Sequence, residues 1–278
     1  MDSIPREGVG KELIDWIMLR HDKLPQEDKE FYRSLPRLLN DLPTLRNYFS
    51  QMSIVDDGVD RVLRQLEESG QTGDTIVIYT ADHGMSLGQH GFWGHGEDTW
   101  PSNTHREAHN IPLIVSGPCD LVSGSVESSL VGTTDIFATI LDYTGLEPLS
   151  GEDISGRSLR PLLKGGNSGW EQEVYMEQEE TRSIRTSKWL FMKRFAPTSF
   201  EFENLLYDLQ DDPGERHNLA TDVKFQNTVT ELNVKIDSFF SRYADPKWDL
   251  WNGGAVKSNS SRPFLWQEVW GDHWKPSF

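Results

Sequence analysis

The chain has 278 residues, long enough for one large domain or two modest ones around a sizeable buried core. Its 44 acidic residues outnumber its 27 basic ones, and the net charge of −17 argues against a protein that binds the phosphate backbone of nucleic acids. The single cysteine, Cys119, excludes an internal disulfide and any metal site built from four cysteines.

Residues 1–36 are polar and contain several prolines, so we expect a surface leader with one short helix near residues 11–20. This segment lacks the basic stretch followed by an apolar stretch that an export signal contains. No apolar run in the chain approaches the roughly 20 residues that a membrane-spanning helix needs. The sequence therefore predicts neither a signal peptide nor a membrane span in this chain, and it leaves the cellular location open.

Residues 37–172 show the pattern of a layered α/β domain. After Pro43, apolar residues recur every three or four positions as far as Leu66, which predicts an amphipathic helix that ends before Gly70. This helix is followed by a short apolar run, and the alternation of helix and strand is typical of an α/β fold.

Two short apolar runs rich in β-branched residues, 75–80 and 111–116, predict buried parallel strands. We expect them to be neighbouring central strands of one sheet, with the helix of residues 43–69 packed on that sheet. A second helix is predicted at residues 135–143.

The pattern changes near residue 173. Residues 173–243 contain short strand-like runs joined by tight connections and then a helix near 225–243, which predicts a small antiparallel α+β subdomain. Residues 244–278 form a tail that holds five of the ten tryptophans. These rings suit either stacking against sugars or fixing the tail onto the rest of the protein.

The loop between the two predicted strands, residues 81–110, is about 30 residues long, and loops of that length inside compact domains usually carry function. Asp82, His83 and Gly84 open it at the carboxyl end of the first strand, where α/β sheets place their ligands. A carboxylate beside an imidazole offers an oxygen and a nitrogen to a divalent metal, and glycine allows a tight turn. The alternative is a strand-terminating turn in which Asp82 accepts backbone N–H bonds.

Histidines are concentrated in this loop, which holds five of the eight within 27 positions. They are His83, His90, His95, His105 and His109. Such a cluster beside a carboxylate is typical of metal binding, proton transfer or anion binding. The alternative is a set of surface histidines in a polar loop.

Several blocks follow one another in a set order, from about Tyr48 to Ala220. They include TIVIYTADHG, LGQHGFWGHG, NIPLIVSGP, TTDIFATILDYTG, SGRSLRPLLKG and LLYDLQDDPGERHNLA. Together they resemble the sulfatase family of the alkaline phosphatase superfamily. The resemblance implies an α/β fold, in which part of an alkaline-phosphatase-like layered sheet domain precedes the small antiparallel α+β subdomain. It also implies hydrolysis of sulfate esters.

The resemblance implies roles for individual residues. Asp82 and His83 would ligate a divalent metal, expected to be calcium. His95 stands where the family commonly has a lysine that contacts sulfate, so it is the expected sulfate contact, although a histidine is charged only below its pKa. His90 and His105 are further candidates for proton transfer. The expected substrate is a sulfated small molecule or glycan.

The family's nucleophile motif, C-x-P-x-R or S-x-P-x-R, is not visible. Cys119 lies in GPCDLV, and Ser3-Ile4-Pro5-Arg6 has the wrong spacing because Arg6 directly follows Pro5. We therefore expect the chain to match the carboxyl-terminal half of a sulfatase and to be inactive alone. The formylglycine nucleophile and two further metal-binding aspartates would lie in the amino-terminal half.

Two alternatives remain open. A phosphonate or phosphate diester hydrolase of the same superfamily would use the same metal residues, since both anions are tetrahedral. A non-catalytic protein would bind a sulfated glycan without cleaving it. The missing nucleophile favours this second alternative, whereas the Asp82–His83 pair disfavours it because a binding protein has less need of a metal.

Overall fold

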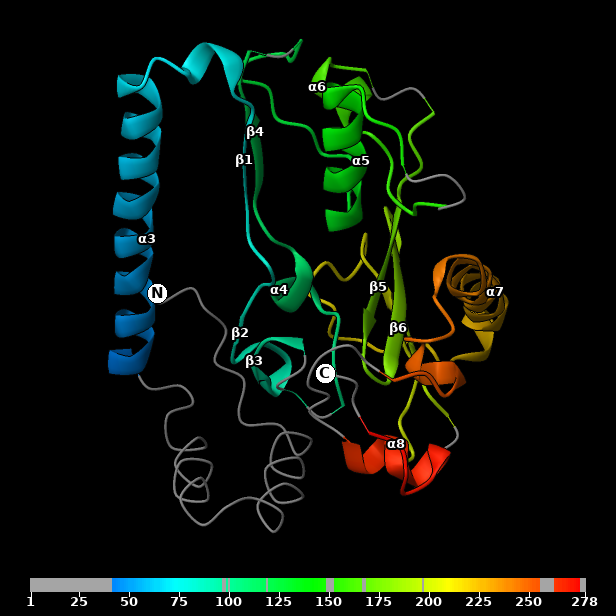
Figure 1. Ribbon diagram of the computed structural model, residues 1–278. Coiled ribbons are helices and arrows are strands. Elements are labelled where there is room, and N and C mark those ends of the chain that lie inside the picture. The colour runs from blue at the N-terminus through cyan, green and yellow to red at the C-terminus, as the bar shows by residue number, and fades with distance from the viewer. Residues whose placement is uncertain are drawn as a thin grey trace. The chain divides into compact units, whose positions relative to one another are not determined.

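The structure is a computed structural model that describes residues 42–96, 99, 101–118, 120–148, 153–166, 169–196, 198–255 and 263–275 (Figure 1). The expected leader, its short helix and Cys119 lie outside these residues. The chain divides into two compact units. The first holds the described residues up to Pro101 and His105–Asp120, and the second holds Ser102–Thr104 and the residues from Leu121 onward. The boundaries predicted at residues 36, 172 and 243 stay predictions.

The first unit begins with the long helix α3 (Leu42–Glu68), which confirms the helix expected after Pro43 (Figure 1). Among its side chains of described burial, Leu45 alone is buried. The apolar stripe includes four side chains that are 43–69% exposed, namely Met52, Val55, Val62 and Leu63. The expected packing of this helix on the sheet is therefore wrong for the described residues, because no described element covers the stripe.

The strands β1 (Val77–Thr80) and β4 (Leu113–Ser116) lie side by side, as expected, with Val77 opposite Ser116. They run antiparallel and form a two-stranded sheet among the described residues, so the expected parallel, central arrangement is wrong. Apolar β-branched residues suit strands of either direction, and the direction of pairing is set by residues outside each run. β1 ends at Thr80, so Asp82 still lies just beyond the end of this strand, as expected.

The second unit is built on a four-stranded antiparallel sheet, which confirms the antiparallel sheet expected after residue 173. Its strands pair in chain order: β5 (Glu173–Gln178), β6 (Thr181–Thr186), β7 (Trp189–Arg194) and β8 (Leu205–Asp208). The helices of this unit are α5 (Thr133–Thr144), α6 (Arg160–Leu163), α7 (Gln226–Tyr243) and α8 (Pro263–Trp270). Across the described part of both units, no helix combines the length and apolar character needed to cross a membrane.

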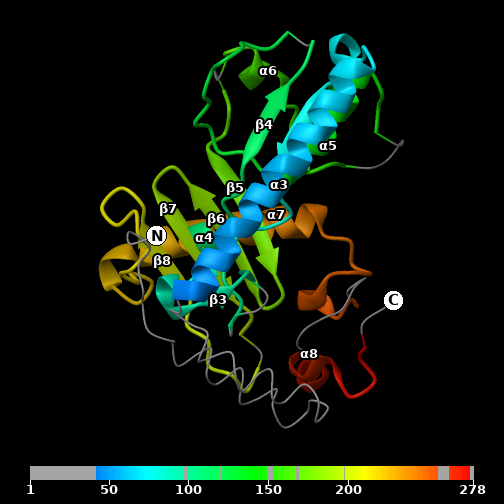
Figure 2. The same ribbon diagram turned by 90° about the vertical axis from the view of Figure 1, so that its left-hand side faces the viewer.

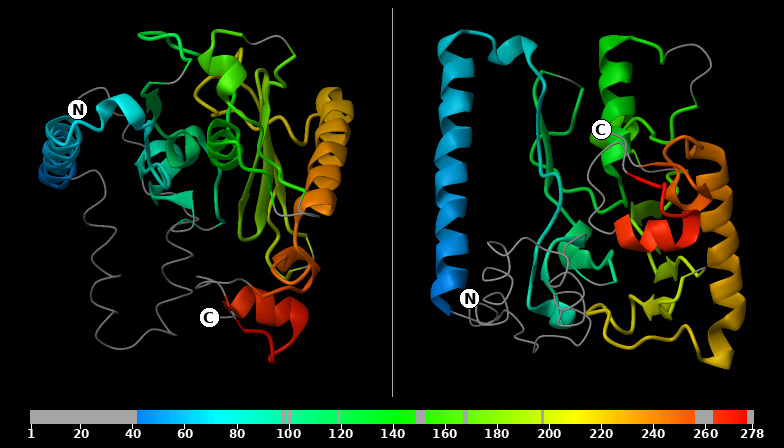
Figure 3. Two further views of the ribbon diagram at one scale, coloured as in Figure 1. Left: turned by 45° about the horizontal axis from the view of Figure 1, so that its top comes forward. Right: turned by 60° about the horizontal axis from the view of Figure 1, so that its bottom comes forward.

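The main core of the second unit lies between the sheet and α7, which runs along one sheet face (Figures 2 and 3). Alternate residues of a strand point to opposite faces, so β6, β7 and β8 each direct apolar side chains at the helix. The buried side chains are Ile184, Phe191 and Leu206 from the sheet and Leu232, Ile236 and Phe240 from α7. At the edge of this core, the Tyr175 and Phe239 rings stack with centroids 4.0 Å apart.

The tail tryptophans fix the tail onto the second unit. Trp266 is fully buried, and its indole N–H donates to the Glu179 carboxylate at 2.7 Å. The Trp251 indole donates to the Glu179 carbonyl at 2.9 Å, and the Trp274 indole donates to the Gly254 carbonyl at 3.0 Å. Buried rings with satisfied N–H groups support the tail-fixing role over stacking against sugars.

We expect Ile236→Ala to lower the free energy of unfolding of the full chain by about 2–5 kcal/mol, because Ile236 is fully buried and truncation leaves a cavity. The matched control is Val234→Ala, which changes a 57% exposed residue of the same helix and should have an effect within about 0.5 kcal/mol. Urea unfolding followed by circular dichroism measures both. Equal losses in the two variants would contradict the assigned face of α7.

Candidate functional site

The loop of residues 81–110, hereafter the histidine loop, contains regular structure. The short strands β2 (Ser86–Leu87) and β3 (Trp93–Gly94) pair antiparallel, with Ser86 opposite Gly94. The turn between them is closed by the Gly88 N–H, which donates to the Phe92 carbonyl at 2.9 Å. The short helix α4 (Arg106–His109) follows in the same unit. The strand pairing and the closed turn therefore constrain the position of the backbone that follows β3.

Gly84 joins the start of the histidine loop to its end. Its N–H donates to the Ala108 carbonyl of α4 at 2.8 Å. A Cβ atom on residue 84 would lie 2.1 Å from the Glu107 carbonyl oxygen, which is far inside the van der Waals contact distance. The backbone of α4 thus occupies the space that a side chain would need, so glycine is required at this position.

Asp82 and His83 direct an oxygen and a nitrogen toward each other. The His83 Nδ1 atom lies 2.8 Å from the Gly84 carbonyl oxygen, which only accepts hydrogen bonds, so Nδ1 carries a proton, and in the neutral ring Nε2 has the lone pair that a metal needs. Nε2 lies 3.7 Å from the Asp82 Oδ2 atom. Histidines that bind metals characteristically donate their other ring N–H to such a carbonyl. The pair therefore fits a divalent cation as two of its ligands.

The pKa of Asp82 lies below its ordinary value. The first cause is the hydrogen bond from the His83 backbone N–H, 2.9 Å from Oδ1, and the second is the charge of the His83 imidazole, with a smaller effect from His95. A carboxyl with a depressed pKa stabilises the fold at pH values above its unfolded pKa, and this stabilisation is lost as the pH falls through the folded pKa. The carboxylate form that a cation requires is therefore favoured.

His95 lies beside this pair. Its ring centroid is 4.2 Å from that of His83, with the two planes tilted by 32°. The histidine loop thus brings together Asp82, His83 and His95, the three residues expected to bind metal and sulfate. Their roles stay predictions.

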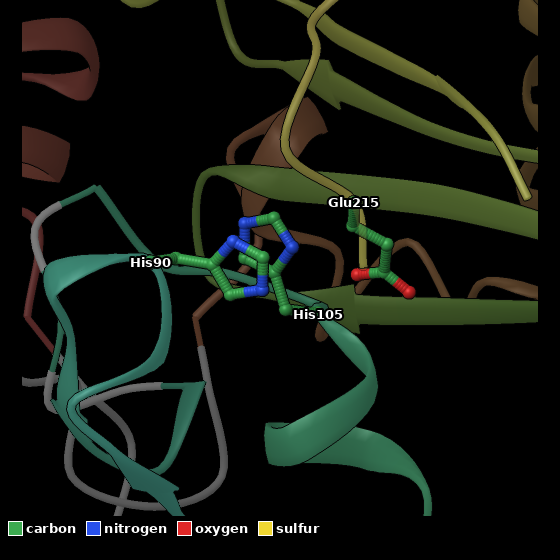
Figure 4. A group of neighbouring side chains, drawn as sticks. All are labelled: His90, His105 and Glu215. Carbon is green, nitrogen blue, oxygen red and sulfur yellow. The ribbon is translucent and has the colours of Figure 1, made fainter. Parts of the chain in front are cut away.

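His90 and His105 form a second pair. Their rings stack with centroids 3.8 Å apart and planes within 7° of parallel (Figure 4). His105 is 2% exposed, and His90 adopts a left-handed backbone conformation with φ of 55°. Figure 4 also draws Glu215, which belongs to the second unit and accepts a hydrogen bond from Arg185 at 2.8 Å.

Glu107 is a residue of this loop that sequence reasoning missed. Its Oε2 atom lies 3.4 Å from Nε2 of His90, and the two side chains are 29% and 10% exposed. An acidic residue in the first turn of a short helix is common, so its position alone gave no signal. Its place within a histidine cluster was the signal that could have identified it.

The chain matches two known protein families over overlapping ranges. Residues 19–146 match the sulfatase family, and residues 96–241 match the carboxyl-terminal region of the N-sulphoglucosamine sulphohydrolase family. The chain is 28% identical over 212 residues to an N-acetylglucosamine-6-O-sulfatase of Bacteroides thetaiotaomicron, covering 72% of this chain and 36% of that protein. It is 30% identical over 216 residues to a multifunctional alkaline phosphatase superfamily protein of Trinickia caryophylli, covering 71% and 40%.

A solved structure has a similar fold. It holds its substrate, D-glucosamine-2-N,6-O-disulfate, and matches this chain with a TM-score of 0.62 and 24% identity over 81% of this chain and 50% of that chain. The likeness confirms the expected α/β class and the alkaline-phosphatase-like fold. The chain spans less than half the length of the two curated relatives.

Gly84→Ala should destabilise the full chain by about 1–3 kcal/mol, because the added Cβ would collide with the Glu107 carbonyl. The control is Gly58→Ala in the same unit, where nothing lies within 4 Å of the added atom. Alanine favours a helix by about 0.5–1 kcal/mol over glycine, so this control should be neutral or stabilising. Thermal unfolding measures both, and a stable Gly84→Ala variant would contradict the close contact.

The depressed pKa of Asp82 should rise only part of the way toward its ordinary value in His83→Ala. The backbone N–H of residue 83 remains in this variant, whereas the imidazole charge is lost. Carboxyl chemical shifts measured against pH by NMR test this. The pKa of Asp142, which hydrogen bonds from Ser158 and Arg160 lower, should not change and serves as the internal control.

Proposed function

The chain belongs to the sulfatase family, and from this premise we propose that it supplies part of the active site of an enzyme that hydrolyses sulfate esters. The observation that carries the proposal is the convergence of Asp82, His83 and His95 directly after β1. These residues combine a cation-binding pair with a nitrogen donor suited to an anion. A tetrahedral sulfate with negative oxygens needs both kinds of contact.

We propose a sulfated glycan or a sulfated small molecule as the substrate. Two relatives support this class. One is named for the 6-O-sulfate of N-acetylglucosamine, and the other was solved with a disulfated glucosamine. The net charge of −17 implies that the contacts to an anionic substrate are local, since the chain as a whole repels anions.

Asp82 and His83 would hold a divalent metal, and we propose calcium. When bound, the metal would supply positive charge to the sulfate oxygens. The Asp82 side chain is 87% exposed, so its carboxylate is open to a cation. Calcium takes about six to eight oxygen ligands, so an imidazole nitrogen would be an unusual member of its ligand set. The Gly84 carbonyl fixes the His83 ring whichever divalent metal binds.

His95 would donate a ring N–H to a sulfate oxygen, and it would add a positive charge only when protonated. His90 and His105 are weaker candidates for proton transfer to the leaving alcohol. Their rings stack on each other, and His105 is almost fully buried, so a substrate has little access to it. These two residues are better suited to shaping the loop.

We propose that the formylglycine nucleophile and the remaining metal ligands lie in polypeptide outside this sequence. Neither C-x-P-x-R nor S-x-P-x-R occurs in the 278 residues. The exposed stripe of α3 supports the same proposal, because a stripe of this kind normally packs on a further layer. On this proposal the chain alone hydrolyses no sulfate ester.

The test fuses this chain to the amino-terminal segment of the complete protein and measures turnover of an aryl sulfate. We expect an active fusion, no turnover by the chain alone, and a loss of about 10²–10³-fold in kcat in the fusion with Asp82→Ala. His95→Ala should also lower turnover. The control is Asp57→Ala, which changes an exposed residue of α3 and should leave turnover unchanged.

Four outcomes would contradict separate parts of this proposal. Robust turnover by the chain alone would contradict the external nucleophile. An active fusion insensitive to Asp82→Ala would contradict only the metal role. Faster turnover of an aryl phosphonate than of an aryl sulfate would favour the phosphonate hydrolase, and binding of a sulfated glycan without turnover would favour the non-catalytic protein.

A further inference from the structure

We propose that Glu107 is a positioning residue that holds two parts of the histidine loop in one arrangement. The metal arm is Asp82 with His83, and the anion arm is His95. The inference rests on the proposed function of these arms. Glu107 acts on the metal arm through its backbone and on the anion arm through its side chain.

The backbone of Glu107 supports the metal arm. Its carbonyl oxygen fills the space beside Gly84, and the next carbonyl, that of Ala108, accepts the Gly84 N–H at 2.8 Å. The Gly84 carbonyl in turn accepts the His83 Nδ1 proton at 2.8 Å. The orientation of the His83 ring is therefore linked to α4 through one residue, Gly84, whose N–H and carbonyl group make the two hydrogen bonds.

The side chain of Glu107 supports the turn that leads to the anion arm. Its Oε2 atom lies 3.4 Å from Nε2 of His90, which is in the turn between β2 and β3. His90 has φ of 55°, a conformation that most side chains adopt only when surrounding contacts hold it. The ring of His105 covers His90 with a centroid distance of 3.8 Å. β3 follows this turn, and His95 directly follows β3. The contact between Glu107 and His90 therefore constrains the backbone position of His95.

Burial explains why this pair is more than a surface ion pair. The His90 side chain is 10% exposed and that of Glu107 is 29% exposed, so both groups are largely removed from water. A largely buried carboxylate is costly unless a polar or positively charged group faces it. The His90 ring faces the Glu107 Oε2 atom at 3.4 Å, which makes an ion pair when the ring is protonated and is not a hydrogen bond. Glutamine at position 107 keeps a polar group of the same size against His90, whereas alanine removes the contact.

The experiment measures amide exchange and histidine ring resonances by NMR in the full 278-residue chain. In Glu107→Ala, the Gly84 and Phe92 amides, which donate to the Ala108 and Gln89 carbonyls, should exchange about tenfold faster, because the loss of the contact between Glu107 and His90 frees both ends of the loop. The ring resonances of His83 and His95 should shift. Glu107→Gln should restore both readouts nearly to those of the wild type.

The matched control is Glu67→Ala, which removes an exposed carboxylate of α3 in the same unit and should change neither readout. Faster exchange confined to the α4 amides, with unshifted His83 and His95 resonances, would overturn the proposal. That result would limit Glu107 to a local role in the helix.

A second variant keeps the test decisive if Glu107→Ala does not fold. His90→Asn tolerates the left-handed backbone, but its side chain is too short to reach Glu107. It should speed exchange at Phe92 and at Gly84 alike. Unchanged exchange at Gly84 in His90→Asn would overturn the link between the two arms.

The active fusion supplies a separate readout. Glu107→Ala should lower kcat for the aryl sulfate about tenfold or more with an unchanged unfolding midpoint, since misplacement of contact groups slows the reaction. Glu107→Gln should recover most of kcat. If the wild-type fusion is inactive, the proposed function fails, while the exchange data on the chain still decide the positioning role.

Discussion

The close contact between Gly84 and the backbone of α4 is the constraint on which the histidine loop depends. The loop leaves β1 at Asp82 and reaches α4 more than 20 residues later, yet its two ends meet at one hydrogen bond. No side chain fits between them. This contact gives a long polar connection a fixed backbone conformation. A binding site needs such rigidity, because its contact groups must keep fixed positions relative to one another.

The histidines of the loop divide into two pairs with different surroundings. His83 and His95 lie beside each other, and the Asp82 carboxylate next to His83 is exposed. His90 and His105 are stacked and largely removed from water. The first pair suits binding, and the second suits support, because the polar atoms of a buried ring are already committed to neighbours. With the proposed roles, one residue type would serve two purposes within a single loop.

Local patterns in the sequence predicted the local features of this structure. The period of apolar residues identified α3, the glycines and histidines identified the loop, and the family resemblance brought Asp82, His83 and His95 together. The direction of β1 relative to β4 and the exposure of α3 depend on what lies beside them, and no local pattern contains that information. The sequence did not identify Glu107, because its proposed positioning role depends on contacts with His90 and Gly84, which are distant in the sequence.

The contacts of Glu179 have a consequence for the order of folding. This residue sits at the connection between β5 and β6 with φ of 48°, and its carboxylate accepts the Trp266 indole N–H across 87 residues. Closing so long a segment costs more chain entropy than pairing two adjacent strands. The hairpin is therefore expected to form first and to offer a preformed acceptor. The tail is expected to pack last. The connection between β5 and β6 therefore becomes fully rigid only after α8, which carries Trp266, has packed against it.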